Sequence, residues 1–262
     1  MRLIAWTETT LLVVIAHGLA PGTAGYNHHR VTVGGFSISL FEANLQTQEQ
    51  LVEKALSDHV SLDGPEADPY GTVLWPAAVP VADRVVDLVR SEAVNQIFEI
   101  GAGTGLVSLA ACAAGASKVV ATDYNPLTLA ILDNGATQNF GANHCIKTQL
   151  FDVTDANERL PQDWGSGALL ACADLLYTPS TSRAVARRCA EALRMNWRVV
   201  IGDCGRPGAG AFLAEMAELL GQPAAFHPVD AFTVAGPRND LIAAEHEVKK
   251  RISVGMIELG GS

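Results

Sequence analysis

Apolar residues switch between helical and strand-like spacing along the chain from about residue 80 onward. Val81, Val85, Val86 and Val89 recur at helical spacing, so we predict a helix with one buried face there. Short apolar runs predict buried strands at 96–100, 118–122, 146–151, 168–173 and 197–202. Helical patterns occupy 105–114, 126–138, 182–194 and 208–220. This alternation predicts an α/β fold with a Rossmann-like, doubly wound, mostly parallel sheet.

The two ends of the chain carry further strand patterns. Residues 31–41 alternate in polarity about Gly34 and Gly35, which predicts an N-terminal β-hairpin. Residues 226–234 and 248–259 predict two more strands, and we expect one strand near the C-terminus to run antiparallel. We therefore divide the chain into an extension or targeting segment, a hairpin with its loop, and a main domain. Their bounds are 1–27, 28–70 and 71–262.

The N-terminal segment contains the apolar run 11–16, followed by small residues at 22–24. This run is far shorter than the roughly 20 residues needed to span a bilayer. A secretory signal, an organelle transit segment and a plain extension all fit this pattern.

Charge and cysteine usage narrow the classes of partner. The chain has 28 acidic and 18 basic residues, a formal net charge of −10. The resulting field repels polyanions, so we expect no nucleic acid and no membrane as partner. The five cysteines form no Cys-x-x-Cys pair, and the histidines lack companions at ligand spacing, so we expect no metal site.

The most informative motif is the glycine-rich run 98–106, directly after a predicted strand and at the start of a helix. Glycines at such a turn let the backbone approach a ligand, and the helix start offers free amide donors. Asp123 ends the next predicted strand, where a carboxylate can accept both hydroxyls of a ribose. The alternative for Asp123 is the N-cap of the helix that starts near Pro126. Leu106 stands where a nicotinamide-dinucleotide fingerprint has its third glycine, which disfavours that cofactor.

Residues 99–105 and 121–126 resemble the first two cofactor motifs of the class I, seven-β-strand S-adenosylmethionine-dependent methyltransferases. The resemblance implies S-adenosyl-L-methionine as cofactor, with Asp123 on its ribose and Glu99 steadying the glycine loop. Residues 151–153 resemble the third motif, which implies Asp152 near the adenine amino group and Val153 against the ring. The alternative for Asp152 is an ordinary loop carboxylate.

Two stretches resemble the protein-lysine methyltransferases within that family. Residues 70–78, with their Trp-Pro pair, imply that Trp75 walls the cofactor pocket, the alternative being a core tryptophan. Asp174 and Tyr177 match the group's Asp-x-x-Tyr motif, which implies that both lie beside the transferable methyl group. The alternative for Asp174 is a cap of the loop after its strand. The implied cofactor-binding residues are Trp75, Glu99, Gly101, Gly103, Gly105, Asp123, Asp152 and Val153.

Residues 198–207 closely resemble a segment of the electron-transfer-flavoprotein beta-subunit lysine methyltransferases, with Cys204 in place of a proline. Arg206 there is expected either to bind substrate or to clamp a loop. The resemblance covers about residues 30–207 and assigns 71–262 as the cofactor-binding methyltransferase domain. It does not extend to 223–262.

The resemblance implies an enzyme that transfers methyl to a lysine amine held near Asp174 and Tyr177. The electron-transfer flavoprotein beta subunit is the leading substrate. The alternatives are small-molecule N-methylation, a non-catalytic cofactor-binding module and a nicotinamide-dependent oxidoreductase. We expect an intracellular protein; the resemblance favours mitochondria over the cytoplasm.

Overall fold

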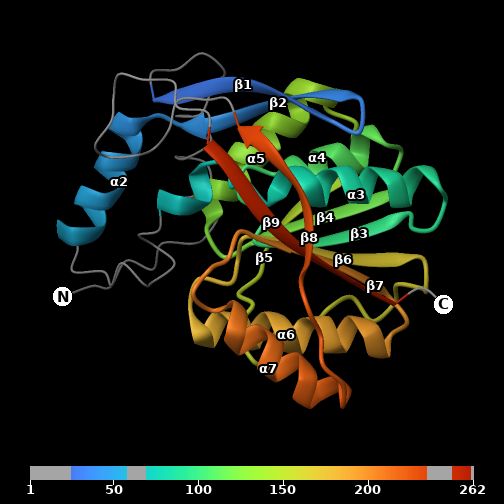
Figure 1. Cartoon of the computed structure of the whole chain (residues 1–262). Helices are drawn as coiled ribbons and strands as arrows, with labels where there is room; N and C mark the ends of the chain where they lie inside the picture. Colours follow the sequence, from blue (N-terminus) through green and yellow to red (C-terminus); the bar gives the residue numbers. More distant parts are fainter. Residues whose placement is uncertain (1–24, 58–68, 235–249, 261–262) are drawn as a thin grey trace, which may run out of the picture.

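The computed structural model describes residues 25–57, 69–234 and 250–260. Its centre is a seven-stranded sheet in the order β5-β4-β3-β6-β7-β9-β8 (Figure 1). The strands are β3 (Gln96–Ile100), β4 (Lys118–Asp123), β5 (Ile146–Leu150), β6 (Ala168–Ala173), β7 (Arg198–Asp203), β8 (His227–Val234) and β9 (Lys250–Leu259). β9 runs antiparallel to both neighbours, whereas β3 to β7 pair in parallel. The predicted mostly parallel sheet with one antiparallel strand near the C-terminus is therefore confirmed.

Helices cover both faces of this sheet, which explains why its central strands are apolar throughout. Figure 1 shows α3 (Ala78–Arg90), α4 (Leu106–Ala113) and α5 (Pro126–Phe140) on one face, and α6 (Pro179–Arg194) and α7 (Ala209–Leu220) on the other. Neighbouring residues of β3 point to opposite faces of the sheet and so pack in two different hydrophobic cores. Ile97 packs with the valines of α3, whereas Phe98 packs with Trp164 and the helices of the other face.

The predicted N-terminal hairpin is also confirmed. β1 (Tyr26–Val33) and β2 (Phe36–Ala43) pair antiparallel around Gly34 and Gly35, both of which have positive φ. Such a two-residue turn matches the twist of the strands that it joins. The hairpin contributes Ile38 and Leu40 to the core of α3 and α4, so it completes one face of the main domain.

The structure corrects the sequence prediction at two helices. The segment after the hairpin, predicted as loop, contains α2 (Leu45–Ser57) and the short 3-10 helix η1 (Pro69–Thr72). Asn44 caps α2, since its side chain accepts the N–H of Thr47 at 2.9 Å. α6 starts at Pro179, three residues before the predicted start, because Thr178 caps it and proline suits its first turn.

Most of the proposed extension, residues 1–24, lies outside the described residues. Within 25–57, 69–234 and 250–260, none of the helices combines the length and apolar character required to cross a bilayer.

Candidate functional site

The predicted glycine loop joins β3 to α4 at the carboxyl edge of the sheet, where open α/β sheets bind ligands. Gly101, Gly103 and Gly105 all have φ between 54° and 84°, a left-handed conformation that suits glycine. At Gly103, an added Cβ would also come within 3.3 Å of the carbonyl oxygen of Gly71. This loop therefore needs glycine both for its conformation and for its close approach to the backbone of η1.

Asp123 lies at the end of β4 with 5% of its surface exposed. Its Oδ2 accepts the N–H of Gly103 at 3.1 Å, and its Oδ1 accepts the N–H of Asn125 at 3.0 Å. The carboxylate thus fixes the glycine loop against β4. The N-cap of α5 is Asn125, whose side chain accepts the N–H of Leu127, so the alternative that Asp123 caps this helix is wrong.

Glu99 is buried under the same loop. Its Oε2 accepts hydrogen bonds from the backbone N–H of Ser108, at 3.0 Å, and from the Ser108 hydroxyl. Burial raises the pKa of Glu99 to about 8, against the lowering effect of these two hydrogen bonds. Glu99 therefore joins the end of β3 to the first turn of α4, and these hydrogen bonds hold the two ends of the glycine loop together.

The segment 69–77, which contains η1 and Trp75, lies over the glycine loop. Glu42 of the hairpin accepts the backbone N–H of Leu74 and holds this segment from the outside. Trp75 is half-buried, and its Nε1–H donates to the carbonyl oxygen of Tyr70 at 2.9 Å. The alternative of a core tryptophan is therefore wrong. Trp75 instead forms part of a partly exposed wall.

Asp174 connects this segment to the ends of β6 and β7. Its Oδ2 accepts the N–H of Ala77 at 2.8 Å, and its Oδ1 accepts the N–H of Cys204 at 2.9 Å. The side chain is fully buried, and the residue has φ 53°. The Cys204 thiol also donates to Oδ2, at 3.4 Å. Asp174 thus joins three chain segments, a larger structural role than the loop cap that was the alternative for this residue.

Arg206 completes this cluster. Its Nε lies 3.4 Å from Oδ1 of Asp174, and its guanidinium stacks over the ring of Trp75 at 4.1 Å. Stacking of this kind adds a cation–π attraction to the ion pair. Arg206 therefore clamps the 69–77 segment to the loop after β7, one of the two roles expected for it.

Tyr177 lies in the loop between β6 and α6 and is 39% exposed. The same loop reaches the glycine loop, because a Cβ on Gly101 would meet the side chain of Leu175 at 2.8 Å. The structure therefore brings the Asp174–Tyr177 motif and the glycine loop into contact at one edge of the sheet.

Asp152 and Val153 lie farther out, after β5. Asp152 is exposed, and its Oδ1 accepts the N–H of Thr154 at 2.8 Å and the hydroxyl of Thr154 at 2.7 Å. Val153 is buried. These contacts are those of a loop carboxylate, and they leave the predicted adenine contact as a prediction.

Asp203 is a site residue that the sequence analysis missed. It ends β7 and is 2% exposed, and its Oδ1 accepts the N–H groups of Gly205 and Arg206, both at 2.8 Å. Its Oδ2 has no hydrogen-bond partner within the described part of the chain. Burial raises the pKa of Asp203, and the neighbouring Asp174 adds to that rise. Its place at a strand end within the resembling segment 198–207 was the available signal.

These residues fit a nucleoside ligand with a charged tail. The glycine loop offers a close backbone approach, Asp123 offers carboxylate lone pairs beside it, and Trp75 offers an aromatic wall. At Gly103, the left-handed φ and the 3.3 Å approach of the Gly71 carbonyl oxygen disfavour a side chain, which keeps the loop backbone open at this point.

The sequence of this chain is similar to those of known methyltransferases. The family model described as ribosomal protein L11 methyltransferase (PrmA) matches residues 83–164. The human electron transfer flavoprotein beta subunit lysine methyltransferase is 29% identical over 147 residues, which cover 55% of this chain and 52% of the relative. The chain spans about half the length of the curated relatives it matches.

Solved structures resemble the chain at the level of the fold. A candidate RNA methyltransferase from Pyrococcus horikoshii aligns with a TM-score of 0.50 and 17% identity, over 81% of this chain and 97% of the other. A candidate methyltransferase complexed with S-adenosylhomocysteine aligns with a TM-score of 0.51 and 11% identity, over 92% of this chain and 58% of the other. With the sheet order and the glycine loop described above, these similarities give one conclusion. The chain has the class I S-adenosylmethionine-dependent methyltransferase fold.

Proposed function

We propose that this chain is an S-adenosylmethionine-dependent methyltransferase that acts on a lysine amine of a protein. The observation that carries the proposal is the joined cluster at the carboxyl edge of the sheet. There, Asp123 fixes the glycine loop, and Arg206 and Asp174 fix Trp75 and its segment. This arrangement supports a cofactor site and a substrate-facing loop at neighbouring strand ends.

S-adenosyl-L-methionine would supply an electrophilic methyl group on a sulfonium. The glycine loop, Asp123 and Glu99 would hold its ribose and methionine portions, with Trp75 as a wall. Asp152 and Val153 are proposed for the adenine end. For in-line transfer, the protein mainly has to orient the nucleophile and exclude water.

The two motif residues are proposed to divide the work at the methyl-transfer point. Both oxygens of Asp174 already accept backbone N–H groups, so its contacts favour a positioning role over that of a base. Tyr177 is exposed and lies three residues farther along, so we propose that its side chain contacts the incoming amine. A lysine with pKa about 10.4 costs roughly 4–5 kcal/mol to deprotonate at neutral pH, and the site must favour the neutral form.

The names of the relatives support a protein as substrate. The family model is named for a ribosomal protein, and the curated relatives for a flavoprotein subunit. We propose the electron transfer flavoprotein beta subunit as the leading substrate.

The function is tested by methyl transfer from labelled S-adenosylmethionine into three preparations: the purified flavoprotein subunit, ribosomal protein L11, and a lysate fractionated into protein and small molecules. Label on a protein lysine, lost in a Tyr177→Phe variant that still binds S-adenosylhomocysteine, is the expected result. Label only in small metabolites would replace the protein substrate by a small amine. Binding of NAD instead of S-adenosylhomocysteine would overturn the enzyme class.

A further inference from the structure

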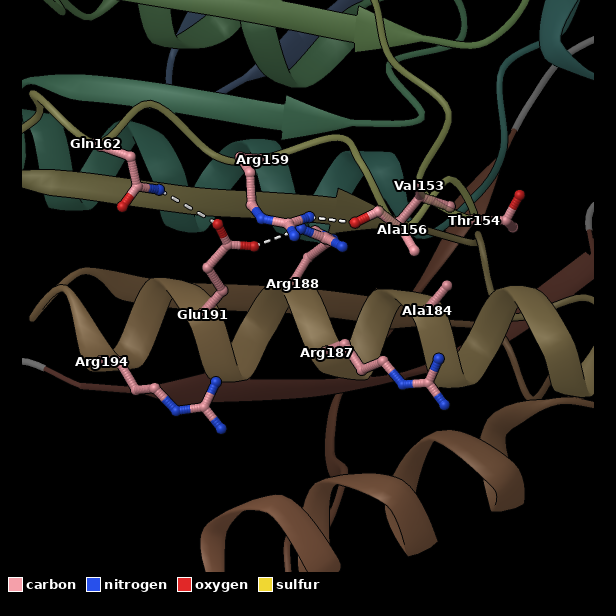
Figure 2. A pocket seen from close by; sticks show the side chains of 10 residues that line it. All are labelled: Val153, Thr154, Ala156, Arg159, Gln162, Ala184, Arg187, Arg188, Glu191 and Arg194. Atoms are coloured by element: carbon pink, nitrogen blue, oxygen red, sulfur yellow. Dashed lines mark hydrogen bonds and ion pairs between the residues drawn. The ribbon is translucent and has the colours of Figure 1, made fainter.

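Next to the candidate site, arginines line a groove of about 650 Å³ beside α6. Figure 2 shows Arg159 and Arg188 together between α6 and the loop after β5, with the side chains of Arg187 and Arg194 projecting below α6 in this view. Glu191 is the single carboxylate among the lining residues. We propose that this groove binds an acidic, extended segment of the protein substrate. The identification of the bound partner as substrate rests on the proposed function.

Arg188 shows that the groove is built into the fold. It is 8% exposed, and its Nη1 donates to the carbonyl oxygen of Glu158 at 2.8 Å and to Oε2 of Glu191 at 2.5 Å. Its Nε has no hydrogen-bond partner within the described part of the chain. This Nε is itself buried, so it does not face the groove. Because Nη1 is held by Glu158 and Glu191, Arg188 places a fixed positive charge beside the groove.

The other three arginines are exposed on the rim. Arg187 pairs with Glu215 of α7 at 2.9 Å, and Arg159 donates to backbone carbonyl oxygens of its own loop. Arg194 makes no ion pair within residues 25–57, 69–234 and 250–260. It lies in the last turn of α6. The rim therefore presents positive charge that internal pairs neutralise only in part, on a chain whose net charge is −10.

The spacing of the charges favours a peptide. Arg187 and Arg194 lie seven residues apart on α6, about 10 Å along its axis. A single phosphate is too small to contact both ends of this row. Carboxylates two to four residues apart on an extended chain are about 7–13 Å apart, which matches the row. The net negative charge of the whole molecule opposes any anion, and it opposes a nucleic acid more than a short acidic segment, because a nucleic acid carries its charge over a much longer distance.

The groove also lies next to the candidate cofactor site. Its lining begins with Val153, beside the proposed adenine end of the cofactor site, and continues along α6. A protein bound there by an acidic segment could reach the Tyr177 loop, which precedes α6, with a neighbouring lysine. Docking away from the reacting amine would raise affinity without contributing to the chemical step.

The test measures binding of a fluorescein-labelled octapeptide of alternating Glu and Ser by anisotropy, against the same peptide with Gln for Glu. The variant Arg159→Ala/Arg194→Ala removes two rim charges, and Arg30→Ala/Lys147→Ala removes two exposed charges elsewhere. We expect salt-sensitive binding of the Glu peptide alone, weakened at least tenfold by the rim variant. The control variant should stay within twofold of the unsubstituted protein. Thermal melting checks that both variants are folded.

Equal weakening by both variants would show a diffuse charge effect and overturn the groove, as would a rim variant that binds normally. A single-stranded oligonucleotide that binds the groove more tightly than the Glu peptide would overturn the peptide assignment. With an identified protein substrate, the rim variant should raise KM with kcat unchanged. If the unsubstituted protein transfers no methyl group to any protein yet binds the peptide as expected, the proposed function fails and the groove stands.

Discussion

At the scale of single residues, the Asp123 carboxylate fixes the glycine loop, and we propose that it also binds the ribose of the cofactor. Asp123→Ala should abolish binding of S-adenosylhomocysteine, because the ligand loses charge-assisted hydrogen bonds and the loop loses its anchor at Gly103. Isothermal titration calorimetry measures this loss. The matched control is Asp87→Ala, an exposed carboxylate on α3. Unchanged affinity in the Asp123 variant would remove this residue from the cofactor site.

At Gly103, the strain from the backbone conformation can be separated from the effect of crowding by comparison with a second glycine. Gly103→Val should block cofactor binding, because φ 54° disfavours a side chain and a Cβ there meets the carbonyl oxygen of Gly71. Gly115→Val provides the comparison, since Gly115 has φ 98° but nothing within 4 Å of its added Cβ. Both variants should lose stability through strain, measured by thermal melting. Only the Gly103 variant should lose affinity, and normal turnover in it would reduce the loop to a structural turn.

The raised pKa of Glu99 predicts that the free energy of unfolding depends on pH. Its pKa of about 8 in the folded state lies above the ordinary 4.5, so the folded protein holds a proton that the unfolded chain releases. The stabilisation from this proton is complete below about pH 4.5 and is lost as the pH rises through about 8. Each pH unit between these values costs on the order of 1 kcal/mol.

The measurement is urea denaturation of the ligand-free protein and of Glu99→Gln from pH 5 to pH 8. The glutamine variant stays neutral, so its stability relative to the unsubstituted protein should rise with pH. A constant difference across this range would show that Glu99 is ionised in the fold.

At the scale of elements, Asp174 joins the 69–77 segment to the ends of β6 and β7. Asp174→Asn keeps a residue type that tolerates φ 53° but leaves one acceptor oxygen for two backbone N–H groups. We expect a loss of about 1–3 kcal/mol in the free energy of unfolding. Affinity for S-adenosylmethionine should stay within a few fold, while single-turnover methyl transfer falls on the order of 10²-fold.

The control is Asp155→Asn on an exposed loop. A near-normal transfer rate in Asp174→Asn, measured where the variant is folded, would contradict any role of Asp174 in the reaction. Tyr177 and Arg206 would then be the candidates for orienting the incoming amine.

One side chain of α5, Asn139, pairs with the backbone of β2 as a neighbouring strand would. The N–H of Ser39 donates to Asn139 Oδ1 at 2.9 Å, and Asn139 Nδ2 donates to the carbonyl oxygen of Ser39 at 2.8 Å. Asn139→Ala should cost about 2–4 kcal/mol, because it leaves two buried backbone groups unpaired. Urea denaturation should show no comparable loss for Asn134→Ala, whose side chain bonds only within α5.

The regular elements were predictable where apolar periodicity or a short apolar run reports burial directly, as in β3 and α3. α2 was missed because its sequence is polar and rich in glutamine, although the capping residue Asn44 was visible beforehand. The early start of α6 was equally visible in its Thr-Pro pair, since the cap and the proline precede the first apolar residue of the pattern. Local chemistry at helix ends, more than periodicity, sets these boundaries.

At the scale of the molecule, the sheet order determines which predicted residues meet. Sequence motifs identified Asp123, Asp174 and Trp75 separately. The stacking of Arg206 on Trp75 joins residues 131 positions apart, and the hydrogen bond from Ala77 to Asp174 joins residues 97 positions apart. No local pattern encodes such contacts, because they depend on β6 lying between β3 and β7.

The place of β9 between β7 and β8 has a consequence for synthesis on the ribosome. β7 is complete at residue 203, but its outer edge is covered only when β9 ends at residue 259. At about 5–20 residues per second, the intervening 56 residues take about 3–11 s to translate. During that time, an apolar strand with an unpaired edge is a template for wrong pairing with other chains. The nascent chain is therefore most exposed to aggregation between the synthesis of β7 and that of β9, when five strands of the sheet are already made.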